Sequence, residues 1–387
     1  MDQKINLRVA NIILDGRFGG PQNRILQVAE GLKKYDIETT VIIPKKDSEV
    51  FYSKLCGKNI CVKKLNLHNL TKHKQHFAAK IVFFLPELFS LYMYLKKEKF
   101  QLIHTNTSWQ IEGVLAGKLA GAKVIMHLND MWTSKFISMI FNFLVPFCDG
   151  FIVTGRRVKE HYFKDNEILN GRNLIEIQAP VDTAIFNPEN VQADNLIKDK
   201  KGLKIITVAN INPTKGLEYF IKMAIILNEQ YKNLVFYIVG ACFESQRNYY
   251  NELMKLTKNF HINNIFFYGN SDNINSCLKA SDIFVCTSLN ESGPMSVWEA
   301  MAMEKAVVSF DVGHVSEYIK DGHNGFVVRK REPFLLAEKV GIFIENEKLR
   351  HDCGKLARAT AIKELDVEIC ADKHRRFYLE ILEVRRS

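Results

Sequence analysis

Short apolar runs alternate with longer amphipathic segments along most of the chain. The runs are rich in Val, Ile, Leu and Phe and have the length of buried β-strands. The segments between them carry apolar residues at helical spacing. This alternation predicts parallel sheets covered by helices, an α/β fold. The apolar runs occupy residues 7–14, 38–44, 102–107, 122–130, 150–155, 203–211, 234–240, 264–270, 282–288, 306–312 and 325–328.

The alternation occurs in two series, separated by the polar segment ENVQADNLIKDKKG. A length of 387 residues also fits two domains of ordinary size. We predict an N-terminal Rossmann-like domain over residues 1–182, a linker over 183–200 and a C-terminal domain over 201–365. Residues 366–387 are expected to form a helix that packs back toward the N-terminal domain.

Composition narrows the classes of partner. The formal net charge of +10 suggests an anionic partner: a nucleotide, a phospholipid surface or nucleic acid. The eight cysteines show no metal-ligand spacing, which favours reduced thiols in a cytoplasmic protein. The first residues have too short an apolar run for a secretory signal. We expect no bound metal and no cofactor.

Two apolar stretches, 77–95 and 136–147, are the best candidates for membrane contact. The first contains Lys80, Pro86 and Glu87 and the second is too short, so neither reads as a membrane span. Both could be buried helices, which is the simpler interpretation. The alternative is a peripheral contact at the inner face of the plasma membrane, because lysines flank the first stretch.

The segment NESGPMSVWEAM carries the most distinctive chemistry. Glu291 and Glu299 flank Gly293-Pro294 and the start of a predicted helix. The free N–H groups of a helix N-terminus suit a phosphate, and carboxylates accept hydrogen bonds from sugar hydroxyls. An amphipathic helix with two solvated glutamates is an equally good interpretation of this segment alone.

In the N-terminal half, several polar residues and a glycine pair fall at the carboxyl ends of predicted strands. Ligands bind at this edge of parallel α/β sheets. A single histidine there is more often structural, but two histidines and a glycine pair at equivalent positions favour a site. These residues are Gly19, Gly20, His104, Asn106, His127 and Asp130.

Five segments, in order, resemble the motifs of family 4 retaining glycosyltransferases of the GT-B fold. ESGPMSVWEAMA resembles the family's E-x7-E motif, and ANINPTKG its phosphate-binding turn. APVDTAIFNP resembles the family's hinge, and DVGHVSEYIKDGHNGFVV its G-G-x-x-E segment. The N-terminal glycine pair also fits. The resemblance implies two facing Rossmann-like domains with an interdomain cleft.

The resemblance also implies a role for individual residues. Lys215 would pair with the diphosphate of a nucleotide sugar, a UDP- or GDP-sugar, Glu291 would contact the transferred sugar, and Glu299 the ribose. His127 would lie near the sugar. The remaining donor contacts would be Gly19, Gly20, Asn210, Gly240, Met295 and Ser296.

The implied reaction is a metal-independent hexosyl transfer with retention of configuration. The acceptor would be a saccharide or a lipid-linked molecule in polysaccharide, lipopolysaccharide or capsule biosynthesis, and nucleic acid is not an expected partner. Three positions depart from the family pattern: Asn210 replaces an arginine, Pro294 a glycine and His314 a glycine. Arg17, Arg24 and Arg329 are the candidate replacements for the missing cation.

Two alternatives to this enzyme remain at this point. A catalytically impaired GT-B protein could bind nucleotide sugars or serve as a scaffold partner, because Asn210 removes one expected diphosphate cation. Another GT-B enzyme acting on nucleotide sugars, such as an epimerase, fits the spacing of the two glutamates less well.

Overall fold

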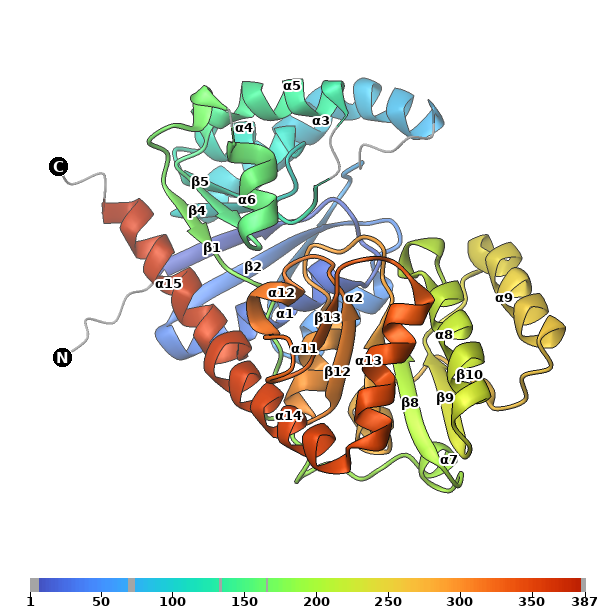
Figure 1. Ribbon diagram of the computed structural model, residues 1–387. Helices are drawn as coiled ribbons and strands as arrows, with labels where there is room; N and C mark the ends of the chain where they lie inside the picture. Colours follow the sequence, from blue (N-terminus) through green and yellow to red (C-terminus); the bar gives the residue numbers. More distant parts are fainter. Residues whose placement is uncertain (1–6, 69–73, 132–133, 165, 384–387) are drawn as a thin grey trace. The chain divides into compact units, whose positions relative to one another are not determined.

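The computed structural model of the protein describes residues 7–68, 74–131, 134–164 and 166–383 (Figure 1). The chain forms two compact units. Unit 1 comprises Met1–Pro180 and Val367–Ser387, and unit 2 comprises Val181–Asp366. Each unit contains one parallel sheet with helices on its faces, so the predicted α/β class with two Rossmann-like domains is confirmed.

The sheet of unit 1 has seven strands in the order β3-β2-β1-β4-β5-β6-β7. The reversal of direction at β1 places the connecting helices on both faces, because parallel crossovers are right-handed. The strands are β1 Leu7–Ile12, β2 Ile37–Pro44, β3 Cys61–Leu65, β4 Leu102–Asn106, β5 Lys123–Leu128, β6 Gly150–Val153 and β7 Leu174–Glu176. The helices are α1 Gly20–Leu32, α2 Glu49–Gly57, α3 Lys74–Glu98, α4 Ile111–Leu119, α5 Lys135–Leu144, α6 Arg156–Phe163 and α15 Val367–Glu383.

One face of this sheet is covered by α3, α4, α5 and α6, whose apolar residues share one core. The other face is covered by α1, α2 and α15. The C-terminal helix α15 packs closely on strand β6 and on helix α1, because a glycine of each faces it. A Cβ added at Gly150 would lie 2.7 Å from Ile381, and one at Gly31 would lie 2.8 Å from Ala371.

The sheet of unit 2 has six strands in the order β10-β9-β8-β11-β12-β13. Its strands are β8 Leu203–Val208, β9 Leu234–Val239, β10 Ile265–Gly269, β11 Ile283–Cys286, β12 Ala306–Phe310 and β13 Phe326–Val328. Its helices are α7 Asn195–Lys198, α8 Leu217–Gln230, α9 Arg247–Asn259, α10 Ile274–Lys279, α11 Met295–Ala302, α12 Val315–Tyr318, α13 Pro333–Glu345 and α14 Glu347–Thr360.

The segment that precedes β8 makes defined contacts within unit 2. Asp194 caps α7 and accepts a hydrogen bond from the Tyr268 hydroxyl at 2.8 Å. Arg358 donates to the carbonyl of Phe186 at 2.9 Å. The first and last residues of unit 2 also meet, because Val181 pairs with Asp366 in an isolated parallel bridge. Across the described ranges of both units, no helix is long and apolar enough to cross a membrane.

Candidate functional site

The two glutamates of the distinctive segment both lie near the carboxyl end of β11, in unit 2. Glu291 belongs to the loop after β11, and Glu299 lies in the second turn of α11. Trp298, Met301 and Ala302 of this helix are fully buried and anchor it in the core of unit 2. Neither glutamate is fully solvated, because both side chains are at least partly buried. This rules out the interpretation of two freely solvated glutamates.

Glu291 forms an ion pair with Lys215. Lys215 ends a short 3-10 turn after β8, and Asn212 caps this turn by accepting the amide of Thr214 at 2.9 Å. The Lys215 Nζ contacts Glu291 Oε1 directly, and the two side chains are only 29% and 17% exposed. The strand ends β8 and β11 therefore place a cation and a carboxylate side by side.

The loops that carry this ion pair are packed tightly against each other. The Thr287 hydroxyl donates to the Lys215 carbonyl at 3.0 Å, and the Leu289 amide donates to Thr214 at 2.8 Å. Gly216 has φ +59°, and a Cβ there would lie 2.4 Å from the Thr287 carbonyl oxygen. A glycine is required because a side chain has neither the space nor the favoured backbone conformation. This packing fixes the position of Lys215.

Glu299 has a perturbed acidity. Burial raises its pKa to about 7, because the charged carboxylate loses hydration. At neutral pH the side chain therefore exists as a mixture of acid and carboxylate, and small changes in its environment decide which form is present.

The N-terminus of α11 lies between the two glutamates in sequence. The helix begins at Met295, with Pro294 at the N-cap and no side-chain cap. The amides of Met295 and Ser296 have no intrahelical acceptor, so they are available to an anion. Gly313, at φ +54°, packs against the backbone of Glu291 and Ser292 and supports this loop.

His314, which departs from the family pattern, is fully buried. Its Nδ1 lies 2.9 Å from Glu317 Oε1, within the same turn. Among the described residues its Nε2 has no hydrogen-bond partner. The side chain is therefore enclosed within unit 2 and held by Glu317 of its own turn.

Asn210 and Gly240 hold the ends of β8 and β9 together. Asn210 Oδ1 accepts the backbone amide of Ala241 at 3.1 Å. Gly240 has φ +156°, and a Cβ there would lie 2.1 Å from the carbonyl oxygen of Ala209. The close approach of the two strand ends thus depends on the glycine.

Replacement of Gly240 by alanine is expected to destabilise unit 2 by roughly 2–4 kcal/mol. The new Cβ would overlap the backbone of Ala209, just after β8, and the backbone at residue 240 would itself be strained. Thermal unfolding followed by circular dichroism measures the loss. Gly57→Ala is the matched control, since a Cβ there meets nothing within 4 Å and stability should stay equal or rise slightly. An equal effect of both substitutions would contradict the steric account.

In unit 1, the predicted glycine pair opens α1. Gly19 is the N-cap, Gly20 is the first helical residue and Pro21 follows. No side chain caps this N-terminus and no acidic residue occupies its first turn. The free amides and the positive end of the helix dipole are therefore available to an anion.

The predicted strand-end residues His104, Asn106 and His127 meet in the interior of unit 1. All three are buried, and His127 and Asn106 contact the guanidinium of Arg24. Arg24 contacts the His127 ring and donates to Asn106 Oδ1 at 2.5 Å. His104 Nε2 lies 3.1 Å from His127 Nδ1. Asp130 accepts a hydrogen bond from the hydroxyl of Tyr162 at 3.2 Å.

The sequence reasoning missed the contribution of α15 to this cluster. Tyr378 donates or accepts a hydrogen bond at 2.6 Å with His104 Nδ1, and His374 stacks on His104 at 5.9 Å between ring centroids. The only available signal was the pair His374 and Tyr378 at helical spacing, which is common on a core-facing helix. The sequence predicted a C-terminal helix packed toward the N-terminal domain, but only the tertiary structure shows that His374 and Tyr378 reach His104.

Burial controls protonation in this cluster. Burial lowers the pKa of His104 and His127 well below the usual value, and it lowers the pKa of His374 to about 3. The positive charge of Arg24 lowers the pKa of all three histidines further. Burial also lowers the pKa of Arg24 to about 10. The cluster therefore holds one guanidinium among neutral imidazoles at neutral pH.

The residues considered as replacements for the missing cation differ in their surroundings. Arg17 pairs with Asp15 at 2.7 Å, and Arg24 belongs to the buried cluster of unit 1. Arg329 is exposed after β13. Arg331, which the sequence reasoning did not consider, donates to the carbonyl of Leu289 at 2.6 Å. Within the described residues, and unlike the three arginines proposed from the sequence, Arg331 has a hydrogen bond to the loop that leads to Glu291.

Unit 2 therefore presents a lysine, two carboxylates and a helix N-terminus near the carboxyl ends of neighbouring strands. Such a combination suits a ligand with both phosphate and hydroxyl groups. Within the part of the chain that the structure describes, no group of three or more His, Cys, Asp or Glu residues is arranged to hold a metal ion.

Two family models together cover most of the chain. Residues 18–184 match Glycosyltransferase Family 4, and residues 189–360 match Glycosyl transferases group 1. The chain is 25% identical over 320 residues to an Escherichia coli enzyme named UDP-Gal:alpha-D-GlcNAc-diphosphoundecaprenol alpha-1,3-galactosyltransferase. That alignment covers 77% of this chain and 80% of the enzyme.

A Campylobacter jejuni enzyme, N,N'-diacetylbacillosaminyl-diphospho-undecaprenol alpha-1,3-N-acetylgalactosaminyltransferase, is 28% identical over 188 residues. The alignment spans about half of each protein: 49% of this chain and 47% of the enzyme.

Solved glycosyltransferase structures share the fold over nearly the full length. A glycosyltransferase from Rickettsia africae ESF-5 superimposes with a TM-score of 0.83 at 19% identity, covering 98% of this chain and 99% of that one. Anabaena HepE, solved in complex with UDP, superimposes with a TM-score of 0.82 at 18% identity, covering 97% and 100%. The family matches and the two parallel-sheet units show that the chain belongs to the GT-B glycosyltransferases of family 4, the glycosyl transferases group 1.

Proposed function

We propose that the protein transfers a sugar from a UDP-sugar to a lipid-linked or saccharide acceptor in the synthesis of a cell-surface polysaccharide. The relatives from E. coli and C. jejuni, whose names specify diphosphoundecaprenol acceptors, support the lipid-linked alternative. HepE, solved with UDP and with UDP-glucose, supports the uridine nucleotide. The observation that carries the proposal is the Lys215–Glu291 ion pair beside the open N-terminus of α11.

In this proposal, Lys215 exchanges its contact with Glu291 for the donor diphosphate. The bond between the sugar C1 and the diphosphate oxygen breaks, and the ammonium neutralises the charge that develops on the leaving group. Glu291, released from the ion pair, accepts hydrogen bonds from the transferred sugar. The amides of Met295 and Ser296 donate to sugar or phosphate oxygens, and Glu299 holds the ribose hydroxyls.

We further propose that the configuration at C1 is retained. The acceptor oxygen attacks the face of the sugar from which the diphosphate departs, and a phosphate oxygen takes the acceptor proton. No protein base is then required. The glycosidic bond forms as the bond to the diphosphate breaks, with UDP as the second product.

The test is a transfer assay with UDP-, GDP- and ADP-sugars, each offered with a diphosphoundecaprenol-linked sugar and with free oligosaccharides. We expect a product from a UDP-sugar. Its C1 proton, observed by NMR, should have the same axial or equatorial orientation as in the donor. Full activity after treatment with EDTA is expected for a metal-independent reaction. Failure to transfer or hydrolyse any donor would refute the function.

A binding protein without catalysis is the second candidate, and Asn210 favours it. The Asn210 side chain holds the amide of Ala241 and brings no positive charge to the strand end. Turnover of any donor by the unaltered protein would exclude this candidate. If the unaltered protein binds a donor without turnover and Asn210→Arg gains turnover, the candidate is supported.

Arg331 is expected to supply part of the missing positive charge. Its guanidinium lies against Leu289, whose amide bonds the turn that carries Lys215. Arg331→Ala should therefore weaken binding of a UDP-sugar about tenfold, the effect of losing one exposed charge-assisted contact. Calorimetric titration gives the dissociation constant, with the exposed neighbour Lys330→Ala as the matched control. Equal affinities of the two variants would show that Arg331 only supports the loop.

A further inference from the structure

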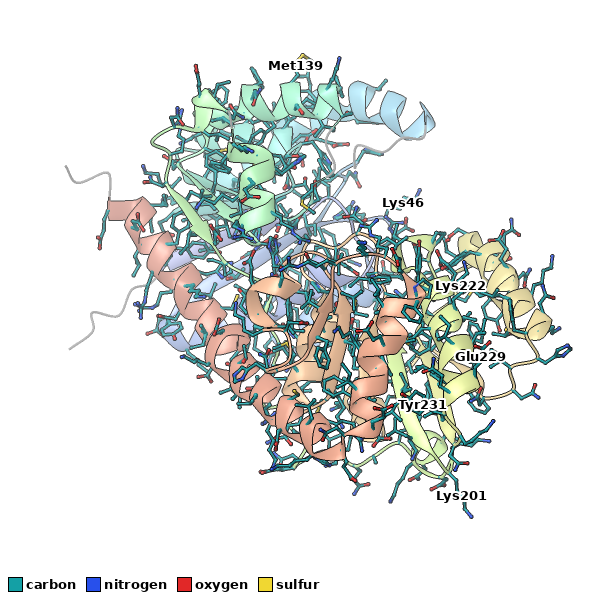
Figure 2. All side chains as sticks on the ribbon, viewed as in Figure 1. Lys46, Met139, Lys201, Lys222, Glu229 and Tyr231 are labelled. Atoms are coloured by element: carbon teal, nitrogen blue, oxygen red, sulfur yellow. The ribbon has the colours of Figure 1, made fainter. Side chains whose placement is uncertain are left out.

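Helix α5 is apolar on both sides. Its inner side, with Ile137, Ile140, Phe141 and Leu144, is buried in the core of unit 1. Its outer side carries Phe136, Met139 and Phe143, which are 45%, 62% and 57% exposed. These three residues follow i, i+3, i+7 spacing and so form one stripe. Figure 2 shows the Met139 side chain pointing outward from this helix.

Helix α3 carries a second stripe of the same kind. Val82, Leu85, Phe89 and Met93 are all at least half exposed and share one side of the helix. Leu91 and Leu95, on its other side, are fully buried. The sequence interpretation of two buried helices is therefore correct for one side of each helix only. Together, the seven exposed residues on α3 and α5 are called the α3–α5 surface.

The two stripes belong to one layer of unit 1. Both helices cover the same face of the sheet, and both pack against α4 (Figure 1). Exposed apolar patches on a soluble protein commonly mark interaction sites. The α3–α5 surface is therefore a candidate docking surface.

The exposed charged residues described at the ends of these helices are lysines. Helix α5 has no acidic residue and begins with the exposed Lys135, while α3 ends with the exposed Lys96 and Lys97. The two acidic residues of α3 are engaged elsewhere. Glu87 is buried against His68, and Glu98 pairs with Arg8 at 3.1 Å. Exposed apolar residues thus lie next to lysines, and the acidic groups are paired within unit 1.

We propose that the α3–α5 surface docks on an anionic lipid bilayer. The apolar stripes would enter the boundary between headgroups and acyl chains, and Lys96, Lys97 and Lys135 would contact phosphate groups. The complementary charge favours this occupant over a second copy of the chain, whose same surface is also basic. The link to catalysis rests on the proposed function, since a lipid-linked acceptor has its reacting sugar at such an interface.

Vesicle sedimentation tests the docking without any substrate. The full chain should bind vesicles containing phosphatidylglycerol at least tenfold more tightly than vesicles of phosphatidylcholine, and binding should weaken as salt rises. Replacement of Phe136, Met139 and Phe143 by serine should lower binding at least tenfold. Lys97→Glu with Lys135→Glu should remove the preference for anionic vesicles.

A matched triple variant controls for the loss of exposed apolar residues. Phe243, Phe260 and Phe334 of unit 2 are 55–59% exposed, and their replacement by serine should leave vesicle binding unchanged. All variants should keep the unaltered melting temperature, because the replaced side chains are largely exposed. Absent vesicle binding, or equal losses in both triple variants, would overturn the proposal. The proposal would also be overturned if light scattering showed a dimer of the unaltered protein that the α5 substitutions convert to a monomer.

The outcomes separate this inference from the proposed function. Vesicle binding without transfer from any donor would support the docking and refute the enzyme. Transfer without vesicle binding would support the enzyme and refute the docking. When both hold, the α5 variant should lose transfer to a lipid-linked acceptor in vesicles at least tenfold and keep its rate with a water-soluble acceptor.

Discussion

Replacement of Lys215 by alanine is expected to lower kcat/KM for sugar transfer about 100- to 1000-fold, the usual cost of losing one group that stabilises developing charge. The reason is the position of its ammonium at the end of β8, fixed by the packing of Gly216 and Thr287. Steady-state rates with a saturating acceptor measure the loss. Lys215→Arg should recover part of it, because the positive charge is kept.

The ion pair with Glu291 allows a sharper version of this experiment. If Lys215 only holds Glu291 in place, Lys215→Ala will have no further effect in a Glu291→Ala background. If it neutralises the diphosphate, the loss will persist there. Lys222→Ala, on the exposed side of α8 (Figure 2), should leave the rate unchanged and serves as the control. A loss below tenfold in the single variant would contradict the proposed role.

Donor affinity is expected to rise with pH up to about 7 and then level off. Burial raises the pKa of Glu299 to about 7, and the ribose hydroxyls are best accepted by the ionised carboxylate. Below pH 7 the carboxylate fraction falls about tenfold per pH unit, and affinity should follow it. Calorimetric titration of a UDP-sugar between pH 5 and 8.5 measures the slope, because its diphosphate diester does not titrate in this range.

The variant Glu299→Gln should bind the donor more weakly and with no slope across the same range. The stability of the unaltered protein should change with pH in the opposite direction to its donor affinity. Because the folded protein raises this pKa, the contribution of Glu299 to stability is complete below about pH 4.5 and is lost as pH rises through 7. Relative to the unaltered protein, Glu299→Gln should therefore become more stable above pH 7. A slope that persists in the variant would assign the titration to another group.

The main strands could be predicted from sequence because they are buried on both faces and read as continuous apolar runs. Strand β3, Cys61–Leu65, was not predicted, because it lies at the edge of the sheet and carries two lysines. The start of α11 was placed one residue early, since Pro294 fits the first helical position but stands at the N-cap. Local patterns do not distinguish these two positions.

The candidate site was only partly predictable. The order of the motifs located Lys215, Glu291 and Glu299, but the ion pair between the first two arises from two strands paired in space. The contact of Arg331 with Leu289 depends on β13 and on the loop after β11, more than 30 residues apart. Sequence spacing carries no information about such distances.

The sequence by itself determined the class of fold, the family and the composition of the donor-side motifs, because hydrophobic period and motif order are local properties. The tertiary structure decided which groups lose their water and which meet. It buried His127 with Arg24 and with α15, placed Glu299 where its pKa rises, and left one side of α3 and α5 exposed. Burial and long-range contact depend on the packing of distant segments, and this packing cannot be read from any one stretch of residues.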